Sequence, residues 1–110
     1  MKKVKMPVTR QGKTHKIKLQ DMSIFVTVNT DKKGRVMEVF STERTNLRGE
    51  LDGLAGLTSI ALRHGTPLKA IVEFLRFRRY EPEGWINQPT SPSDALGRVL
   101  ESYLPKDEQL

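Results

Sequence analysis

A short run of arginines with a glycine precedes the first segment that has helical spacing. Just before Leu51, where the apolar period becomes that of a helix, stand Arg44, Asn46, Arg48 and Gly49. The free N–H groups and the dipole at a helix start favour an anion such as phosphate, and guanidinium groups add paired donors. No Walker or dinucleotide spacing accompanies these residues, so they are also typical of an ordinary polar loop with exposed arginines. The pattern indicates a candidate phosphate site.

A second cationic cluster follows a later apolar stripe. It contains Arg76, Arg78 and Arg79 beside Tyr80. Single-strand binders combine cations that hold phosphates with rings that stack on bases, a role open here to Tyr80 or Trp85. Cations after a helix also interact favourably with its free carbonyl groups, which explains the cluster without a ligand. For Trp85 we expect instead a place covering the sheet or helices, because tryptophans usually bury much of their area.

Positive charge is concentrated at the start of the chain. The 110 residues carry a formal net charge of +6. Asp21 is the first acidic residue, so every charged side chain before it is positive. Lys13, Lys16 and Lys18 are the candidate nucleic-acid contacts here, because phosphate neutralisation gives affinity that does not depend on base sequence. A solvated basic surface is the alternative interpretation, since net charge also serves solubility.

The residue types exclude several kinds of chemistry. Cysteine is absent, so the chain has no disulfide, thiolate nucleophile or thiyl radical. His15 and His64 have no metal-ligand companions at suitable spacing. Nothing in the spacing positions the remaining carboxylates as a set, namely Glu38, Glu43, Glu50 and Asp52. We therefore expect no metal, no other cofactor and no catalytic residues, and a divergent enzyme is the last-ranked hypothesis.

The apolar periods predict strands first and helices afterwards. Alternation over 14–19, 23–29 and 35–41, with turn residues at 29–34, predicts a small antiparallel sheet of about three strands. Helical spacing follows, and two to three helices are expected to pack on one face of the sheet. The predicted fold class is α+β.

Capping residues set the expected helix boundaries. Gly65 should end the first helix, and Thr66 should cap a second helix whose first residue is Pro67. Ser91 is the expected cap of the third helix, with Asp94 three residues later in an arrangement like a capping box.

These boundaries divide the chain into three parts. We expect a basic flexible arm over 1–12, a single domain over 13–104 and a polar tail over 105–110. The N-terminus lacks the apolar core of a secretory signal, and no run is long enough to cross a bilayer. We expect a cytoplasmic protein that does not contact membranes.

The run Thr90-Ser91-Pro92-Ser93-Asp94 resembles the motif that names the TSCPD domain, with its cysteine missing. The best-known setting of this domain is the C-terminal region of adenosylcobalamin-dependent (class II) ribonucleotide reductases. The similarity extends to the segments 14–17, 24–28, 38–40, 59–68 and 79–84 and to the turn glycine Gly34. The resemblance implies fold and ancestry. Because the family cysteines are absent, it implies neither reductase activity nor a metal for this chain.

The charge and the resemblance together predict a non-catalytic accessory or binding domain. Its expected ligand is a nucleotide or nucleic-acid phosphate held by the basic residues, and a reductase-like protein partner is a further expectation. The alternative is a protein-protein interaction module, including a homodimer, because a small sheet has edges that invite pairing.

Overall fold

Three strands are followed by three helices, and the predicted α+β class is confirmed. The computed structural model describes residues 3–42 and 48–110. The elements are β1 (Gln11–Leu19), β2 (Met22–Thr30), β3 (Val36–Thr42), α1 (Arg48–Arg63), α2 (Leu68–Leu75), α3 (Pro92–Glu101) and the 3-10 turn η1 (Lys106–Glu108). The strands form one antiparallel sheet in the order β1-β2-β3.

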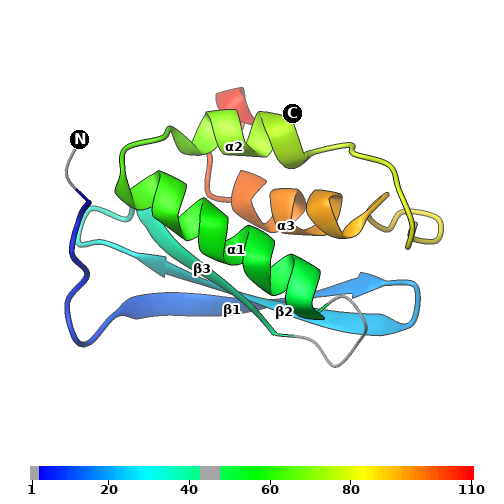
Figure 1. Ribbon diagram of the computed structural model, residues 1–110. Helices are drawn as coiled ribbons and strands as arrows, with labels where there is room; N and C mark the ends of the chain where they lie inside the picture. Colours follow the sequence, from blue (N-terminus) through cyan, green and yellow to red (C-terminus); the bar gives the residue numbers. More distant parts are fainter. Residues whose placement is uncertain (1–2, 43–47) are drawn as a thin grey trace.

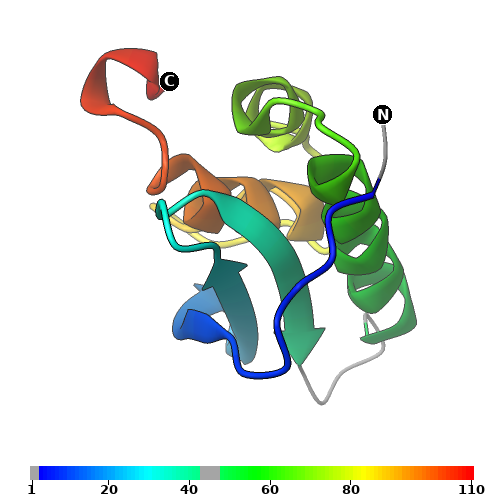
Figure 2. The same cartoon turned by 90° about the vertical axis from the view of Figure 1, so that its left-hand side faces the viewer.

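The helices all lie on one side of this sheet (Figure 1). Helix α1 packs chiefly on β3, α3 packs near β1 and α1, and α2 packs on α3 farther from the sheet (Figure 2). The alternation of β2 explains this arrangement, because Ile24, Val26 and Val28 are fully buried under the helices. The opposite side of the sheet, which no described helix covers, is called the open face below.

Gly65 ends α1 as predicted, but the predicted cap of α2 is wrong. Gly65 adopts φ +97°, and its N–H donates to the carbonyl of Leu62 at 3.1 Å. The N–H of Thr66 donates to the carbonyl of Ala61 at 3.0 Å, which completes a Schellman-type helix end. Thr66 is therefore part of the end of α1, and Pro67 precedes α2 without any side-chain cap.

The predicted cap of α3 is confirmed. The Oγ of Ser91 accepts a hydrogen bond from the N–H of Asp94 at 3.0 Å, and Pro92 is the first helical residue. The carboxylate of Asp94 accepts from the N–H of Thr90, one residue before the cap. In a standard capping box this carboxylate would reach the N–H of Ser91 itself.

The segment over residues 3–10 is tied to the domain at Val4 and at Arg10. The N–H of Val4 donates to the carbonyl of Arg63 at 2.9 Å, and Nε of Arg63 donates back to the carbonyl of Val4 at 2.8 Å. Nε of Arg10 lies 2.6 Å from Oε1 of Glu38. Strand β1 begins at Gln11, so the boundary expected after residue 12 falls inside this strand.

Candidate nucleic-acid interface

The motif at the start of α3 places a carboxylate inside the protein. Asp94 is 1% exposed. Its Oδ1 accepts from the N–H of Phe77 at 2.8 Å and from Nη1 of Arg76, and its Oδ2 accepts from the N–H of Thr90 at 3.0 Å. These hydrogen bonds connect the residues after α2 to the start of α3.

The same contacts set the charge state of Asp94. Burial by itself would raise the pKa of this carboxyl, because a charge is poorly solvated in the interior. The hydrogen bonds from the N–H groups of Phe77 and Thr90, with the Arg76 guanidinium, outweigh burial and lower the pKa below 3.8. Asp94 is therefore an anion at neutral pH, with its acceptor capacity used within the protein.

Arg76 is enclosed by the same arrangement. Besides Asp94 it binds Glu101, with 2.8 Å between Nε and Oε1, and the guanidinium carbon lies 4.1 Å from the centre of the Phe77 ring. Only 10% of the Arg76 side chain is exposed. Arg76 therefore links the end of α2 to both ends of α3. Together Arg76, Phe77, Thr90, Asp94 and Glu101 form what we call the α2–α3 junction.

The other members of the predicted arginine cluster lie at the surface. The guanidinium of Arg78 lies over the ring of Phe74, 3.7 Å from its centre, and its Nε donates to the carbonyl of Phe74 at 2.7 Å. Arg79 pairs with Glu83. Tyr80 is 42% exposed and its hydroxyl lies 2.5 Å from Oγ of Ser93. The structure thus separates the cluster into an enclosed Arg76 and exposed neighbours.

Trp85 does not cover the sheet or helices, so that prediction is wrong. Its side chain is 60% exposed. The surrounding loop is instead fixed by Gln88, whose Oε1 accepts from the N–H groups of Trp85 at 2.9 Å and Gln20 at 2.6 Å. The backbone of the loop is thereby tied to the β1–β2 turn, and the indole is left largely in solvent.

The three predicted lysines of β1 divide between the two faces of the sheet. Lys16 and Lys18 alternate with the inward residues His15 and Ile17 and so belong to the open face, whereas Lys13 shares the side of His15. All three lysines are exposed. Among the described residues, no carboxylate forms an ion pair with any of them. Lys18 donates to the backbone carbonyl of Asp21, at 3.1 Å.

Two phenylalanines accompany these lysines and were not among the predicted site residues. Phe25 is 39% exposed and Phe40 is 49% exposed. Phe25 pairs directly with Lys16 across the β1–β2 ladder. The sequence signal that could have found both rings is the alternation in β2 and β3, which places them on the face opposite to the buried valines. Alternation alone does not reveal which face the helices leave open.

The structure describes only part of the predicted phosphate loop. Arg44 and Asn46 lie outside the described residues. Arg48 and Gly49 begin α1, and Gly49 is exposed. Helix α1 thus begins earlier than predicted, because Arg48 and Gly49 were expected to precede it, and phosphate binding there stays a prediction.

Comparison with known proteins decides the family. The sequence profile of the TSCPD domain matches residues 2–104. The chain belongs to the TSCPD domain family.

Similar full-length proteins are much longer than this TSCPD domain. The chain is 34% identical over 83 residues to a vitamin B12-dependent ribonucleotide reductase of Rhodopirellula baltica, covering 73% of the chain and 8% of that protein. It is 30% identical over 114 residues to the enzyme of the same name from Agrobacterium fabrum, covering 94% of the chain and 9% of that protein. The domain is thus related to the C-terminal region of such reductases. No solved structure matches the chain significantly.

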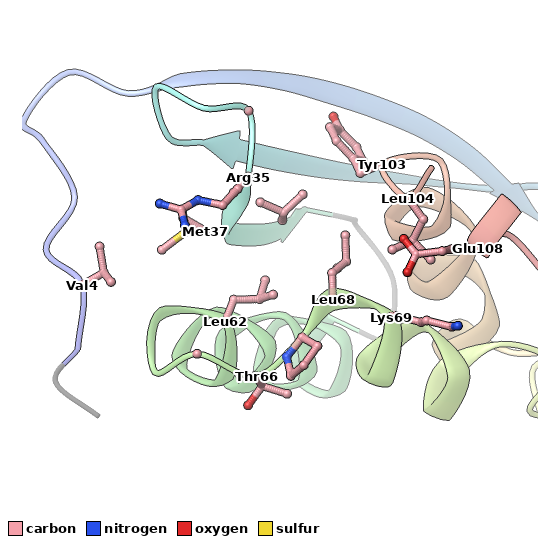
Figure 3. A pocket seen from close by; sticks show the side chains of 14 residues that line it. Val4, Arg35, Met37, Leu62, Thr66, Leu68, Lys69, Tyr103, Leu104 and Glu108 are labelled. Carbon is pink, nitrogen blue, oxygen red and sulfur yellow. The ribbon is translucent and has the colours of Figure 1, made fainter. Parts of the chain in front are cut away.

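The TSCPD domain also has a cavity of about 550 Å³ between the end of α1, the start of α2 and the start of β3 (Figure 3). Its walls are largely apolar and include Met37, Leu62 and Leu68. Arg35 and Lys69 stand on opposite sides of it. None of the described residues that line it is a predicted site residue, so the predicted cations and the cavity are separate features.

The parts of the chain that the structure describes contain neither a candidate metal site nor a candidate membrane-spanning helix. There, no three histidine or acidic side chains gather as a metal site would require. His15 is instead held by Tyr103, with 2.6 Å between Nε2 and the hydroxyl, and burial raises the pKa of Tyr103. Within residues 3–42 and 48–110, no helix has the length and apolar character needed to span a bilayer.

Proposed function

We propose that this TSCPD domain is a non-catalytic accessory module that binds nucleic-acid phosphates through basic residues. The observation that carries the proposal is the placement of Lys16 and Lys18 on the open face, exposed and without an ion-pair partner among the described carboxylates. Cations that no carboxylate neutralises are free to replace the counterions of a phosphate chain, and release of those counterions drives binding. The net charge of +6 favours approach of a polyanion.

The predicted site residues contribute unequally to this proposal. Lys16 and Lys18 are its centre, and Lys13 lies at the same strand on the other side. Arg78, Arg79 and Tyr80 would form a secondary contact, as would the loop with Arg44, Asn46, Arg48 and Gly49. Arg76 is left out as a phosphate ligand, because two carboxylates already occupy its guanidinium.

A nucleic acid is favoured over a free nucleotide. Nucleotides usually bind in a cavity that encloses most of their surface. The predicted cations stand on strands and loops outside the described cavity. A long phosphate chain, in contrast, gains affinity from cations spread along an exposed surface.

Charge substitutions test this proposal. Fluorescence anisotropy at low salt should show that the wild type binds a short oligonucleotide, and that Lys16→Gln/Lys18→Gln weakens this binding. The matched control is Lys32→Gln/Lys33→Gln, which removes the same charge from the exposed β2–β3 turn and should bind more tightly than the open-face double variant. Equal affinities for the two double variants would show that the open face is not the site, and no binding by the wild type would refute the proposed function.

Separate substitutions test the two secondary contacts, the cluster at Arg78 and Arg79 and the loop with Arg44 and Arg48. Arg78→Gln/Arg79→Gln and Arg44→Gln/Arg48→Gln should each weaken oligonucleotide binding less than the open-face double variant. A larger loss from either would move the main phosphate contact to that site. Titration with nucleoside triphosphates is the comparison. Saturable binding of a triphosphate with higher affinity than the oligonucleotide would favour the nucleotide alternative.

An interaction module is the second candidate function. Leu57 and Ile60 of α1 are 64% and 50% exposed, and the neighbouring Gly53 and Gly56 have open space where a Cβ would lie. This apolar ridge would suit a second copy or a reductase-like protein partner, because Leu57 and Ile60 offer apolar contacts and the two glycines leave room for close approach. Light scattering tests it: a dimer that Leu57→Lys dissociates and oligonucleotides leave unchanged would favour assembly as the role.

The proposed function also includes a cellular compartment. We place the domain in the cytoplasm, the compartment expected for a chain whose sequence contains no cysteine. Fractionation of cells that produce the tagged protein would check this, and recovery outside the cytoplasmic fraction would contradict it.

A further inference from the structure

The open face combines rings, hydroxyl groups and cations in adjacent rows. One row across the three strands consists of Lys16, Phe25 and Thr42. The next row consists of Thr14, Thr27 and Phe40, in which the two threonine hydroxyls are 2.8 Å apart. All described helices lie on the other side of the sheet (Figure 1). A surface with aromatic and basic residues is thus presented to solvent.

The two rings are close neighbours. Phe25 pairs with Thr42 and Phe40 pairs with Thr27, so the phenylalanines occupy diagonal positions on adjacent strands. Such positions lie about 7–8 Å apart, which is within reach of aromatic side chains. Single exposed apolar residues occur on any protein surface, but here two partly exposed rings adjoin each other and an unpaired lysine.

We propose that the open face binds single-stranded nucleic acid, with unpaired bases stacked on Phe25 and Phe40 and the phosphates beside Lys16 and Lys18. This inference rests on the proposed function and specifies its ligand and its contacts. Base stacking on aromatic side chains tolerates any sequence, because every base has a π face. Sheets in other folds use exposed rings in this way to hold two or three bases.

A duplex fits these residues less well. Paired and stacked bases hide their faces inside the helix, so a duplex could meet only the lysines. A single strand can meet the rings and the lysines together. The open face should therefore prefer a single strand to a duplex of the same sequence.

A second copy of the chain is a poorer occupant. Two open faces brought together would oppose Lys16 and Lys18 of one chain with the same lysines of the other, and like charges in an interface are unfavourable. Glu38 lies on this face near the start of β3, but its side chain is 7% exposed and is bound by Arg10 and Arg63. It therefore offers little negative charge to a basic partner.

The test replaces each ring with an aliphatic side chain. Phe25→Leu and Phe40→Leu keep apolar bulk over the strands and remove the stacking surface, and thermal melting confirms that each variant folds. Each should bind a 12-nucleotide single strand at least about fivefold more weakly, the lower end of the effect of losing one stacking contact. Duplex binding should change less. The matched control is Phe74→Leu, which removes a ring that is 62% exposed on α2, and it should lower single-strand affinity less than either open-face variant.

A spectroscopic measurement on the wild type does not depend on any variant. A single strand that contains 2-aminopurine should change its fluorescence on binding, because stacking on a ring alters the environment of the base. The inference would be overturned if Phe25→Leu and Phe40→Leu each bound single strands as tightly as the wild type. It would also be overturned if only Phe74→Leu lost affinity. Either result would leave the proposed phosphate binding intact. Absence of all oligonucleotide binding would overturn the proposed function as well. A dimer that dissociates in the Phe25→Leu or Phe40→Leu variant would identify a second copy as the occupant and also overturn the inference.

Discussion

The α2–α3 junction and the open face use their cations in opposite ways. At the junction, Arg76 is enclosed by Asp94 and Glu101, and only 10% of its side chain is exposed. On the open face, Lys16 and Lys18 are exposed and have no ion-pair partner among the described carboxylates. The contrast teaches that cationic clusters in one sequence divide into groups that stabilise the fold and groups that remain available to a ligand.

The largest expected effect comes from removing the central carboxylate of the junction. Asp94→Ala should lower the free energy of unfolding by about 3–5 kcal/mol, because it leaves the largely buried Arg76 with Glu101 as its remaining carboxylate partner and removes the acceptor of the Phe77 and Thr90 N–H groups. Urea denaturation measures this loss. The control is Glu83→Gln at the exposed Arg79–Glu83 pair, for which about 0–1 kcal/mol is expected. Similar losses for the two variants would contradict a structural role specific to the junction.

Acid should weaken the junction in a defined pH range. The pKa of Asp94 is lowered in the folded protein, so its contribution to stability is fully present above the unfolded pKa of about 3.9. This contribution is lost as the pH falls through the folded pKa, so the thermal midpoint should decline below about pH 4. Asp94→Asn should show a smaller decline over that range than the wild type. Parallel pH profiles for the two proteins would refute this assignment.

A smaller effect is expected at the edge of the junction. Tyr80→Phe removes the hydroxyl that bonds to Ser93 and should cost about 0.5–1.5 kcal/mol of unfolding free energy. It keeps the ring, so single-strand affinity should not change. Chemical denaturation and anisotropy on the same sample separate the two properties. A loss of affinity with unchanged stability would show that the Tyr80 hydroxyl itself contacts the nucleic acid.

The smallest stability effect is expected on the open face. Lys16→Gln/Lys18→Gln should change the free energy of unfolding by less than about 0.5 kcal/mol, because substitutions of exposed side chains that form no ion pair with a described carboxylate usually have small effects. Urea denaturation would reveal it. A loss of 2 kcal/mol or more would mean that these lysines stabilise the fold and would remove the contrast with the junction.

The sequence predicted the elements because their signals are local. Apolar periods of two and of about three and a half residues identified the strands and helices, and Ser91 identified the start of α3. Thr66 was wrongly predicted as a cap because the same residue also suits the end of α1, and only the hydrogen bond to Ala61 decides between these roles.

The site was harder to predict because it depends on contacts between distant residues. Arg76 meets Asp94, 18 positions away, and Glu101, 25 positions away, so its neighbours Arg78 and Arg79 gave no indication that it alone is enclosed. Phe25 and Phe40 were missed because both faces of β2 carry apolar residues. Only the packing of the helices determines which face stays open.

The most direct test of the central claim is the salt dependence of single-strand binding. Between 50 and 200 mM salt, each phosphate contact contributes about 0.7 to the slope of log affinity against log salt concentration. We predict that Lys16→Gln/Lys18→Gln reduces the magnitude of the wild-type slope by about 1.4, the sum for two contacts. We also predict that Lys32→Gln/Lys33→Gln leaves the slope unchanged. Equal slopes for the wild type and the open-face double variant would contradict the account.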